Sequence, residues 1–258
     1  MSVHIEVAAH YEFLREYVSQ IPARFNQLGT AVHDARNIIR IDLQDNVKLV
    51  IKSYRQIYIF NRFFYANVVP SKAKRAYLYA KKLINKGFQT PEPIAYIECV
   101  NKGLMRDSYF VSTYIDYQPL RDIYQMPREE ALKVLDQLAA LTWHLHEEGI
   151  YHKDYSIGNI LFKKNEQGNY DFSLVDNNRM KFTKGSFADR MKNLRRLDLP
   201  LPMLAYFCQQ YANSSGENDL LSLSTMLNYR KHRIVYRSRK DRVKHLFRRF
   251  LPFRQADV

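Results

Sequence analysis

The sequence predicts an α+β fold with two lobes, a β-rich lobe followed by a mainly helical one. Strand-like runs dominate residues 1–115, and helical patterns dominate the rest of the 258-residue chain. Hydrophobic residues make up 46% of the sequence and aromatic residues 14%, which favours a packed globular protein over a disordered one. Strands first and helices second is the order typical of α+β proteins.

The elements follow from local patterns. The strand-like stretches, each interrupted by turn residues, are residues 37–55, 94–115 and 159–176. The helix-like stretches are residues 7–21, 71–87 and 127–149, with a mostly helical pattern after residue 191. Asp45 and Asn46 suit a hairpin turn. Ser71 can cap the second helix, while Gly87 and Gly149 can end the second and third.

The charge is uneven along the chain. Residues 228–258 hold eleven Lys or Arg and two acids, a net charge of +9, which leaves +5 of the total +14 for the other residues. Pro119 disfavours a helix start at residues 115–120, so we expect a linker there. The sequence thus predicts three parts: residues 1–115, 116–227 and a basic aromatic tail at 228–258.

The tail has three interpretations. A solvated charged face is the first. The second is a helix on an anionic membrane surface, because apolar residues interrupt the basic ones at near-helical spacing. Nucleic-acid binding ranks last, since no stacking module or recognition motif accompanies the tail.

The cysteines, the N-terminal stretch and the apolar runs indicate the cellular location of the protein. Cys99 and Cys208 are the only cysteines, which excludes a disulfide framework and favours a reducing compartment. The N-terminal stretch carries charges within its apolar run, unlike a signal peptide, and no apolar run is long enough for a transmembrane helix. We expect a cytoplasmic protein.

The stretch "HKDYSIGN" at residues 152–159 precedes the third hairpin pattern. If that hairpin turns near Gln167 and Gly168, Asn159 lies opposite Asp176, close enough for both to hold Mg²⁺. A register slip of one residue would leave both at the same end of the hairpin. Asp154 could face the same cation from the substrate side and accept a proton from an attacking hydroxyl, or orient it. His152 would hold the backbone beside Asp154.

A lysine for the phosphates completes the parts that phosphoryl transfer needs. Lys52 ends the apolar run "LVIK", which predicts a buried strand that aims this lysine inward. Lys48 is an alternative, because strand residues four apart point to the same side.

The chain resembles the protein-kinase-like superfamily, since "HKDYSIGN" fits the catalytic loop H-R-D-x-x-x-x-N and "LVD" stands where the metal-binding Asp is expected. More narrowly, it resembles the lipopolysaccharide core kinases, which phosphorylate Kdo or heptose in the inner core. The similar stretches, "IPARFNQLGTAVHDARNIIRI", "VIKSY", "KAKRAYLYAKKLINKGFQTPEPIAYIE", "HKDYSIGNILF", "LVDNNRM" and "NLRRL", span residues 21–197.

The resemblance implies a bilobal kinase fold, with residues 1–115 as the nucleotide-binding lobe and 116–227 as the catalytic lobe. It implies that Asp154 is the catalytic carboxylate, that Asn159 and Asp176 bind Mg²⁺, and that Lys52 holds the α/β-phosphates of ATP. Adenine would lie against the backbone at residues 114–116. The acceptor would be a sugar hydroxyl of the lipid-linked core saccharide, met at the inner face of the inner membrane.

Two departures from the kinase pattern leave other functions open. The stretch "NQLGTAVHDARN" offers one glycine, Gly29, where kinases have a glycine-rich loop. No Asp or Glu occurs from Ser53 to Pro91, and Leu78 stands where the acid partner of Lys52 is expected. The alternatives are a kinase for another small molecule or for protein tyrosine, and a catalytically weak pseudokinase whose tail binds membrane or nucleic acid.

Overall fold

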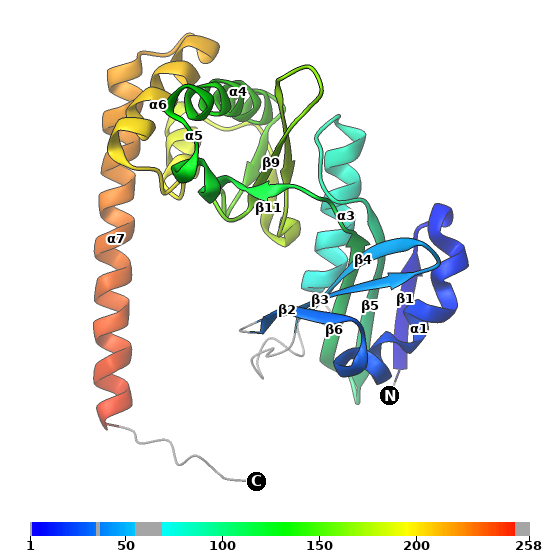
Figure 1. Cartoon of the computed structure of the whole chain (residues 1–258). Coiled ribbons are helices and arrows are strands. Elements are labelled where there is room, and N and C mark those ends of the chain that lie inside the picture. The colour runs from blue at the N-terminus through cyan, green and yellow to red at the C-terminus, as the bar shows by residue number, and fades with distance from the viewer. Residues whose placement is uncertain (1, 35–36, 55–68, 251–258) are drawn as a thin grey trace. The chain divides into compact units, whose positions relative to one another are not determined.

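The structure, a computed structural model, describes residues 2–34, 37–54 and 69–250, with residues 33–34 and 244–250 described by their backbone alone. The chain forms two compact units (Figure 1). The first comprises Met1–Asp122 and Gly158–Met180, and the second comprises Ile123–Ile157 and Lys181–Val258. The N-terminal part is rich in strands and the C-terminal part is helical, which confirms the predicted fold class.

An antiparallel six-stranded sheet forms the centre of the first unit, in the order β1-β5-β6-β4-β3-β2. Its strands are β1 (Ser2–Val7), β2 (Thr30–Asp34), β3 (Ile38–Gln44), β4 (Val47–Ser53), β5 (Pro93–Asn101) and β6 (Leu104–Thr113). Strand β1 was not predicted, because its sequence alone gives a weak signal. It forms an edge strand through its pairing with β5.

Two tight turns fix the register of the central hairpins. Asp45 and Asn46 have φ angles of 47° and 62°, and the turn joins β3 to β4 as the sequence predicts. Lys102 and Gly103, with φ angles of 49° and 71°, join β5 to β6. Two consecutive positive φ angles give the turn type whose twist matches that of the flanking strands.

The helices of the first unit pack on its sheet. The predicted helix at residues 7–21 is a 3₁₀ turn, η1 (Ala9–Leu14), followed by α1 (Arg15–Arg24) and a second 3₁₀ turn, η2 (Phe25–Gln27). Val18 and Ile21 of α1 pack in one hydrophobic core cluster with Leu49 and Ile51 of β4. Helix α3 (Lys72–Asn85) begins at Ser71, whose hydroxyl accepts from the Lys74 N–H at 3.0 Å.

A small three-stranded sheet completes the first unit. It contains β7 (Gln118–Pro119), β9 (Ile160–Lys164) and β10 (Tyr170–Leu174), in the order β10-β9-β7. Its hairpin belongs to this unit because β7 pairs with β9 and because the Leu174 N–H donates to the Gln89 carbonyl at 3.0 Å. Residues 158–180 therefore belong to the same compact unit as Met1–Asp122, and their segment 177–179 packs against α3.

The hairpin register differs by one residue from the predicted one. Leu174 pairs with Ile160, so Asn159 lies beside Val175 rather than opposite Asp176. The reason is the loop at residues 165–169, whose odd length centres the turn on Gln167. Asn165 closes this loop, because its backbone N–H donates to the Asn169 carbonyl at 2.8 Å and its side chain accepts from the Asn169 N–H.

The second unit is built on the predicted helix α4 (Arg128–Glu147) with α5 (Phe187–Leu194), α6 (Leu201–Ser215) and α7 (Asp219–Phe250). Strand β8 (Ile150–His152) pairs with β11 (Met180–Phe182), and η3 (Leu120–Gln125) and η4 (Asn177–Arg179) are short 3₁₀ turns. Gly149 ends α4 with a φ of 67°, and a Cβ there would lie 2.9 Å from the Thr183 carbonyl carbon.

Helix α7 begins nine residues before the expected start of the basic tail, so Asn228 lies inside a helix. Its later turns extend beyond the other helices of the second unit (Figure 1). Among the helices that the structure describes, none combines the length and apolar character needed to cross a bilayer. Cys99 and Cys208 are both buried free thiols, and burial raises the pKa of the Cys99 thiol to about 11.

Candidate active site

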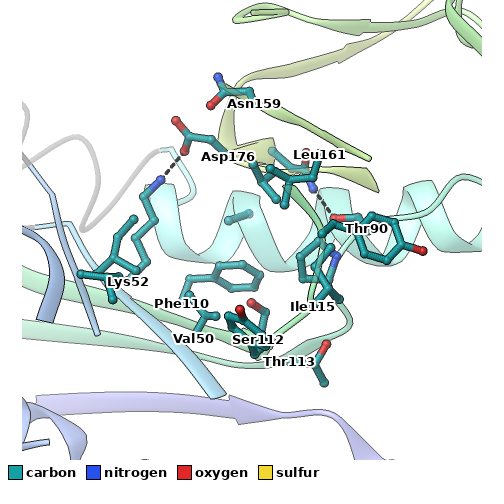
Figure 2. A pocket seen from close by; sticks show the side chains of 18 of the residues that line it. Val50, Lys52, Thr90, Phe110, Ser112, Thr113, Ile115, Asn159, Leu161 and Asp176 are labelled. Atoms are coloured by element: carbon teal, nitrogen blue, oxygen red, sulfur yellow. Dashed lines mark hydrogen bonds and ion pairs between the residues drawn. The ribbon is translucent and has the colours of Figure 1, made fainter. Parts of the chain in front are cut away.

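A pocket of about 530 Å³ opens in the first unit, within the range of small-molecule sites. One wall comes from the sheet, including Val50, Lys52 and Phe110, and another from the β9–β10 hairpin, including Asn159 and Asp176 (Figure 2). Three of the four sequence-predicted site residues thus line one cavity, although more than a hundred residues separate Lys52 from the hairpin.

Lys52 reaches into this pocket from β4. Its ammonium group donates to Oδ1 of Asp176 at 2.6 Å (Figure 2), and its side chain is 13% exposed. The alternative, Lys48, lies over the Tyr114 ring, with Nζ 3.6 Å from the ring centroid. The two lysines of this strand face therefore have different partners, and Lys52 is the one paired with a carboxylate.

Asp176 has an unusual backbone conformation. Its φ and ψ angles of 61° and 42° lie in the left-handed region, which is uncommon for a residue other than glycine and costs roughly 1–3 kcal/mol. Such strain is concentrated at functional sites, where surrounding contacts hold it. Within the described chain both hydrogen bonds of this carboxylate go to Oδ1, from Lys52 and Asn178.

The two asparagines after Asp176 hold it in place. Asn178 donates through Nδ2 to Asp176 Oδ1 at 3.1 Å and to the Tyr54 hydroxyl at 3.2 Å. Asn177 donates to Thr90 Oγ1 at 2.7 Å. Tyr54 is fully buried, and burial raises the pKa of its hydroxyl. In the sequence "DNN", where kinases have Asp-Phe-Gly, Asn178 therefore fixes the carboxylate, while Asn177 anchors the neighbouring backbone to Thr90 and Leu174.

Sequence reasoning gave Asn178 and Tyr54 no role. The only feature of the sequence that could have indicated Asn178 and Tyr54 is their position, because each lies within two residues of a predicted site residue.

Asn159 stands at the start of the hairpin, where its carbonyl accepts from the Val175 N–H at 3.0 Å. Its side chain lines the same pocket wall as Asp176 (Figure 2). A carboxylate and an amide oxygen are the hard donors that Mg²⁺ takes when substrate phosphates complete its shell. This pocket wall fits a magnesium ion.

The structure shows the surroundings of Gly29 and Leu78, the positions of the two departures from the kinase pattern. Gly29 precedes β2 with a φ of 34°, and a Cβ there would lie 2.0 Å from the Ile41 carbonyl oxygen, so close backbone approach requires glycine. The tip of the β2–β3 hairpin, residues 35–36, lies outside the described residues. On α3, Ala76 lines the pocket, whereas Leu78 is 42% exposed. Leu78 is therefore not the position that faces Lys52.

Asp154, the fourth predicted residue, belongs to the second unit. Its Oδ1 accepts a hydrogen bond from Arg196, which follows α5. Its backbone N–H donates to Nδ1 of His152 at 3.1 Å, which requires that nitrogen to be unprotonated. His152 is buried, 2% exposed, and holds the backbone beside Asp154 as predicted. The part played by Arg196 was not predicted, although it lies within "NLRRL".

The loop around Asp154 is anchored to α4 on its other side. The Thr142 hydroxyl donates to the Leu138 carbonyl at 2.6 Å, so its oxygen accepts from the Tyr155 hydroxyl at 2.7 Å. Burial raises the pKa of the Tyr155 hydroxyl, which keeps it protonated as a donor. Asp154 therefore sits between two fixed neighbours, His152 and Tyr155.

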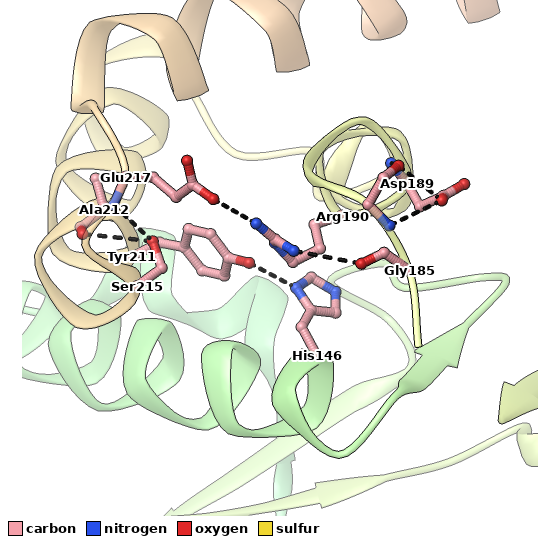
Figure 3. A network of polar contacts seen from close by, with 9 residues as sticks. His146, Gly185, Asp189, Arg190, Tyr211, Ala212, Ser215 and Glu217 are labelled. Atoms are coloured by element: carbon pink, nitrogen blue, oxygen red, sulfur yellow. Dashed lines mark hydrogen bonds and ion pairs between the residues drawn. The ribbon is translucent and has the colours of Figure 1, made fainter. Parts of the chain in front are cut away.

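A buried polar network lies behind this loop. His146 of α4 contacts the Tyr211 hydroxyl through Nδ1 at 2.8 Å (Figure 3) and Asn193 Oδ1 through Nε2 at 3.1 Å. Asn193 in turn donates through Nδ2 to the His152 carbonyl at 2.8 Å. Burial lowers the pKa of His146 to about 4, so this histidine is neutral at pH 7. The network connects α4, α5 and α6 to the residue that holds Asp154.

Comparisons with known proteins identify the family of this chain. The model of the lipopolysaccharide kinase (Kdo/WaaP) family matches residues 59–215. A solved structure described as WaaP in complex with acyl carrier protein is similar over 89% of this chain and 97% of its own, with a TM-score of 0.61 and 14% identity. No curated protein matches. Because the family model covers more than half of the chain, this protein belongs to the lipopolysaccharide kinase (Kdo/WaaP) family and is an enzyme of the kinase class.

Proposed function

We propose that this enzyme transfers the γ-phosphoryl group of ATP to a hydroxyl of Kdo or heptose in the inner core of lipopolysaccharide. The observation that carries the proposal is the ion pair of Lys52 with Asp176 in a pocket that Asn159 also lines. Phosphoryl transfer depends on positioning and on charge stabilisation. Lys52 would supply positive charge to a triphosphate, and the oxygens of Asp176 and Asn159 would position a metal ion beside it.

Each residue has a distinct role in this proposal. Lys52 would bind the α/β-phosphates. Asp176, through Oδ2, and Asn159 would hold Mg²⁺, which would neutralise the charge that develops on the phosphates. The hydrogen bonds from Lys52 and Asn178 to Oδ1 of Asp176 support this role, because they fix one carboxylate oxygen and leave Oδ2 for a metal.

The nucleotide base would lie against the segment after β6. Tyr114 and Ile115 line the pocket, and the Tyr114 N–H donates to the Lys48 carbonyl at 2.8 Å. Within the described chain no backbone hydrogen bond uses the N–H of Ile115. A backbone donor at a pocket wall suits the edge of an adenine ring.

Asp154 would act on the acceptor. Its carboxylate would orient the sugar hydroxyl or accept its proton as the oxygen attacks the γ-phosphorus. The hydrogen bonds from Arg196 to Asp154 and from the Asp154 N–H to His152 support this role, because they fix the carboxylate in one orientation.

The later turns of α7 would bring the enzyme to its lipid-linked acceptor at an anionic membrane surface. Val235, Tyr236 and Val243 share one face of this helix and are at least 41% exposed. Basic residues, among them Lys231 and Lys240, surround that face. An exposed apolar face flanked by basic residues is the pattern of a helix that lies in the membrane interface.

Two measurements test the proposal against its alternatives. A pseudokinase would show no Mg²⁺-dependent increase in melting temperature with ATP, whereas the proposed enzyme binds Mg²⁺ and ATP together and is stabilised by them. Transfer of labelled phosphate to purified core saccharides, compared with transfer to tyrosine peptides, identifies the acceptor class. We expect label in the saccharide alone.

A further inference from the structure

Helix α7 carries a stripe of arginines that begins on the side packed against the rest of the second unit and continues to the exposed Arg237. Arg230, Arg233 and Arg237 follow the fully buried Met226 at spacings of four, seven and eleven residues, which places all four on one helix face. Arg230 and Arg233 are partly buried rather than extended into solvent. Near the N-terminal end of this stripe lies the segment that follows α5.

That segment adds two more arginines, Arg195 and Arg196. Arg196 donates to Asp154, and Arg230 donates to Asp198 at 2.5 Å and to the Leu199 carbonyl at 3.1 Å. Among the described residues, no carboxylate forms an ion pair with Arg195 or Arg233. Five arginines thus face two carboxylates, Asp154 and Asp198.

The charges of this cluster repel one another. Burial and the neighbouring Arg196 and Arg237 lower the pKa of the Arg233 guanidinium, against the smaller opposite effects of Asp154 and Asp198. Burial and Arg196 also lower the pKa of Arg195. Like charges three or four residues apart destabilise a helix. A folded chain keeps such a cost at functional sites, where a ligand of opposite charge relieves it.

We propose that Arg233 and Arg196, with Arg195 and Arg237 around them, form an anion subsite that binds a carboxylate or phosphate group of the sugar acceptor beside Asp154. Guanidinium groups bind both anions with paired hydrogen bonds, which a neutral sugar cannot match. The subsite rests on the proposed function and narrows it: the acceptor carries a negative charge close to the hydroxyl that is phosphorylated.

The subsite also gives a second use to the Arg196 contact. Asp154 would be held by Arg196 in the free enzyme, and an anionic acceptor would share that guanidinium when it binds. Binding of the acceptor's negative charge and orientation of the Asp154 carboxylate would then both depend on Arg196. Arg233, which has no carboxylate partner among the described residues, would be the principal anion ligand.

The test compares Arg233→Gln with the matched control Arg239→Gln, which removes the same charge from another, exposed face of α7. Core saccharides are supplied in three forms: with a carboxylate only, with a phosphate only, and neutral after esterification or dephosphorylation. We expect Arg233→Gln to raise KM for a charged acceptor about tenfold or more, the effect of losing one charge-assisted hydrogen bond. KM for ATP should not change, and Arg239→Gln should behave as the wild type.

The three acceptor forms separate the possible sources of the anion. A rise in KM of Arg233→Gln confined to the carboxylated form identifies the bound anion as the carboxylate of a sugar acid. A rise confined to the phosphorylated form identifies it as a phosphate. Either result supports the subsite. Arg233→Lys, which keeps the charge but not the fork, should recover part of the loss. An equal KM for Arg233→Gln and Arg239→Gln with every acceptor, or an equal loss with the neutral form, overturns the subsite.

The proposed function can fail separately. If the wild-type enzyme phosphorylates no core saccharide in any form, that proposal is wrong, and the subsite is judged by binding of inorganic phosphate, followed by ³¹P NMR. Phosphate should then bind more weakly to Arg233→Gln than to Arg239→Gln, since both retain the pocket of the first unit. Equal binding to the two variants would exclude the subsite.

Discussion

The ammonium group of Lys52 lies 2.6 Å from Oδ1 of Asp176, across 124 residues of sequence. Helix α3 carries no acid to pair with this lysine, and the pair with Asp176 supplies the carboxylate that the kinase pattern places on a helix. Because Asp176 is also the expected metal ligand, one carboxylate would both pair with Lys52 and bind the metal. The ion pair therefore holds the two side chains together in the structure.

Replacement of Lys52 by Met should weaken nucleotide binding and slow transfer. The change removes the cation expected on the phosphates, so we expect turnover to fall by about 10²–10³, as for loss of one charge-stabilising donor. The control is Lys48→Met, which removes a charge from the same strand face and should retain most activity. Steady-state kinetics with varied ATP measure both. Equal losses in the two variants would contradict the assignment of Lys52.

Asn178→Leu should reduce the affinity for Mg²⁺ without removing a proposed ligand. The variant loses the amide that holds both Asp176 and Tyr54, and groups behind a metal ligand typically contribute about 10- to 100-fold in affinity. Activity titrated with Mg²⁺ should show the shift. Tyr54→Phe, which removes only the more distant partner, should have a smaller effect. An unchanged Mg²⁺ requirement in Asn178→Leu would show that the amide does not position the ligand.

Stability should fall as the pH drops from about 6.5 to about 4, because of His146. The folded protein binds a proton to His146 with a pKa of about 4, against about 6.5 when unfolded, so the unfolded state takes up the proton first. The neutral form is stabilising above pH 6.5, and that contribution is lost on the way down to pH 4, on the order of 3 kcal/mol.

Denaturant unfolding at several pH values measures this slope. In His146→Gln the slope between pH 6.5 and 4 should flatten, whereas in His144→Gln, an exposed histidine of the same helix, it should match the wild type. A wild-type slope that persists in His146→Gln would mean that other groups titrate in this range.

Gly29→Ala should destabilise the first unit strongly. The new Cβ would overlap the Ile41 carbonyl at 2.0 Å, and a well-packed site relieves such overlap only by backbone shifts that cost about 1–3 kcal/mol. Gly168→Ala is the comparison, since its φ is also positive but no atom lies within 4 Å of the new Cβ; it should cost about 1 kcal/mol. Similar midpoints in denaturant for the two variants would exclude the close approach.

Membrane binding should depend on the exposed apolar face of α7. Val235→Glu combined with Val243→Glu places negative charge where the acyl chains would lie, so binding to vesicles with anionic headgroups should fall at least about tenfold. Leu43→Glu, at a more exposed apolar position in the first unit, is the control. Vesicle sedimentation at low and high salt measures the loss. Binding that persists in the double variant would place the contact elsewhere.

Much of this protein could be predicted from local sequence, because local chemistry determines turns and helix ends. Asp45 and Asn46 accept positive φ, Ser71 caps α3, and Gly149 ends α4 where a side chain would meet the backbone of Thr183. The inward direction of the Lys52 side chain, which is 13% exposed, also followed from the apolar run before it.

The remainder depends on contacts between distant segments, which no local pattern encodes. The hairpin register shifted by one residue because a loop with its own hydrogen bonds set the turn. Asn178 and Arg196 gain their roles only from the side chains that folding brings to them, Asp176 and Asp154. Strand β1 exists because β5 offers it an edge.

The most direct test of the account is phosphate transfer from labelled ATP to purified core saccharides by the wild-type enzyme and by Asp154→Ala. The account predicts Mg²⁺-dependent label in the saccharide with the wild type. It predicts none above background with the variant, whose thermal unfolding should show that it still folds. Undiminished transfer by a folded Asp154→Ala would contradict the central claim that this carboxylate acts on the acceptor hydroxyl.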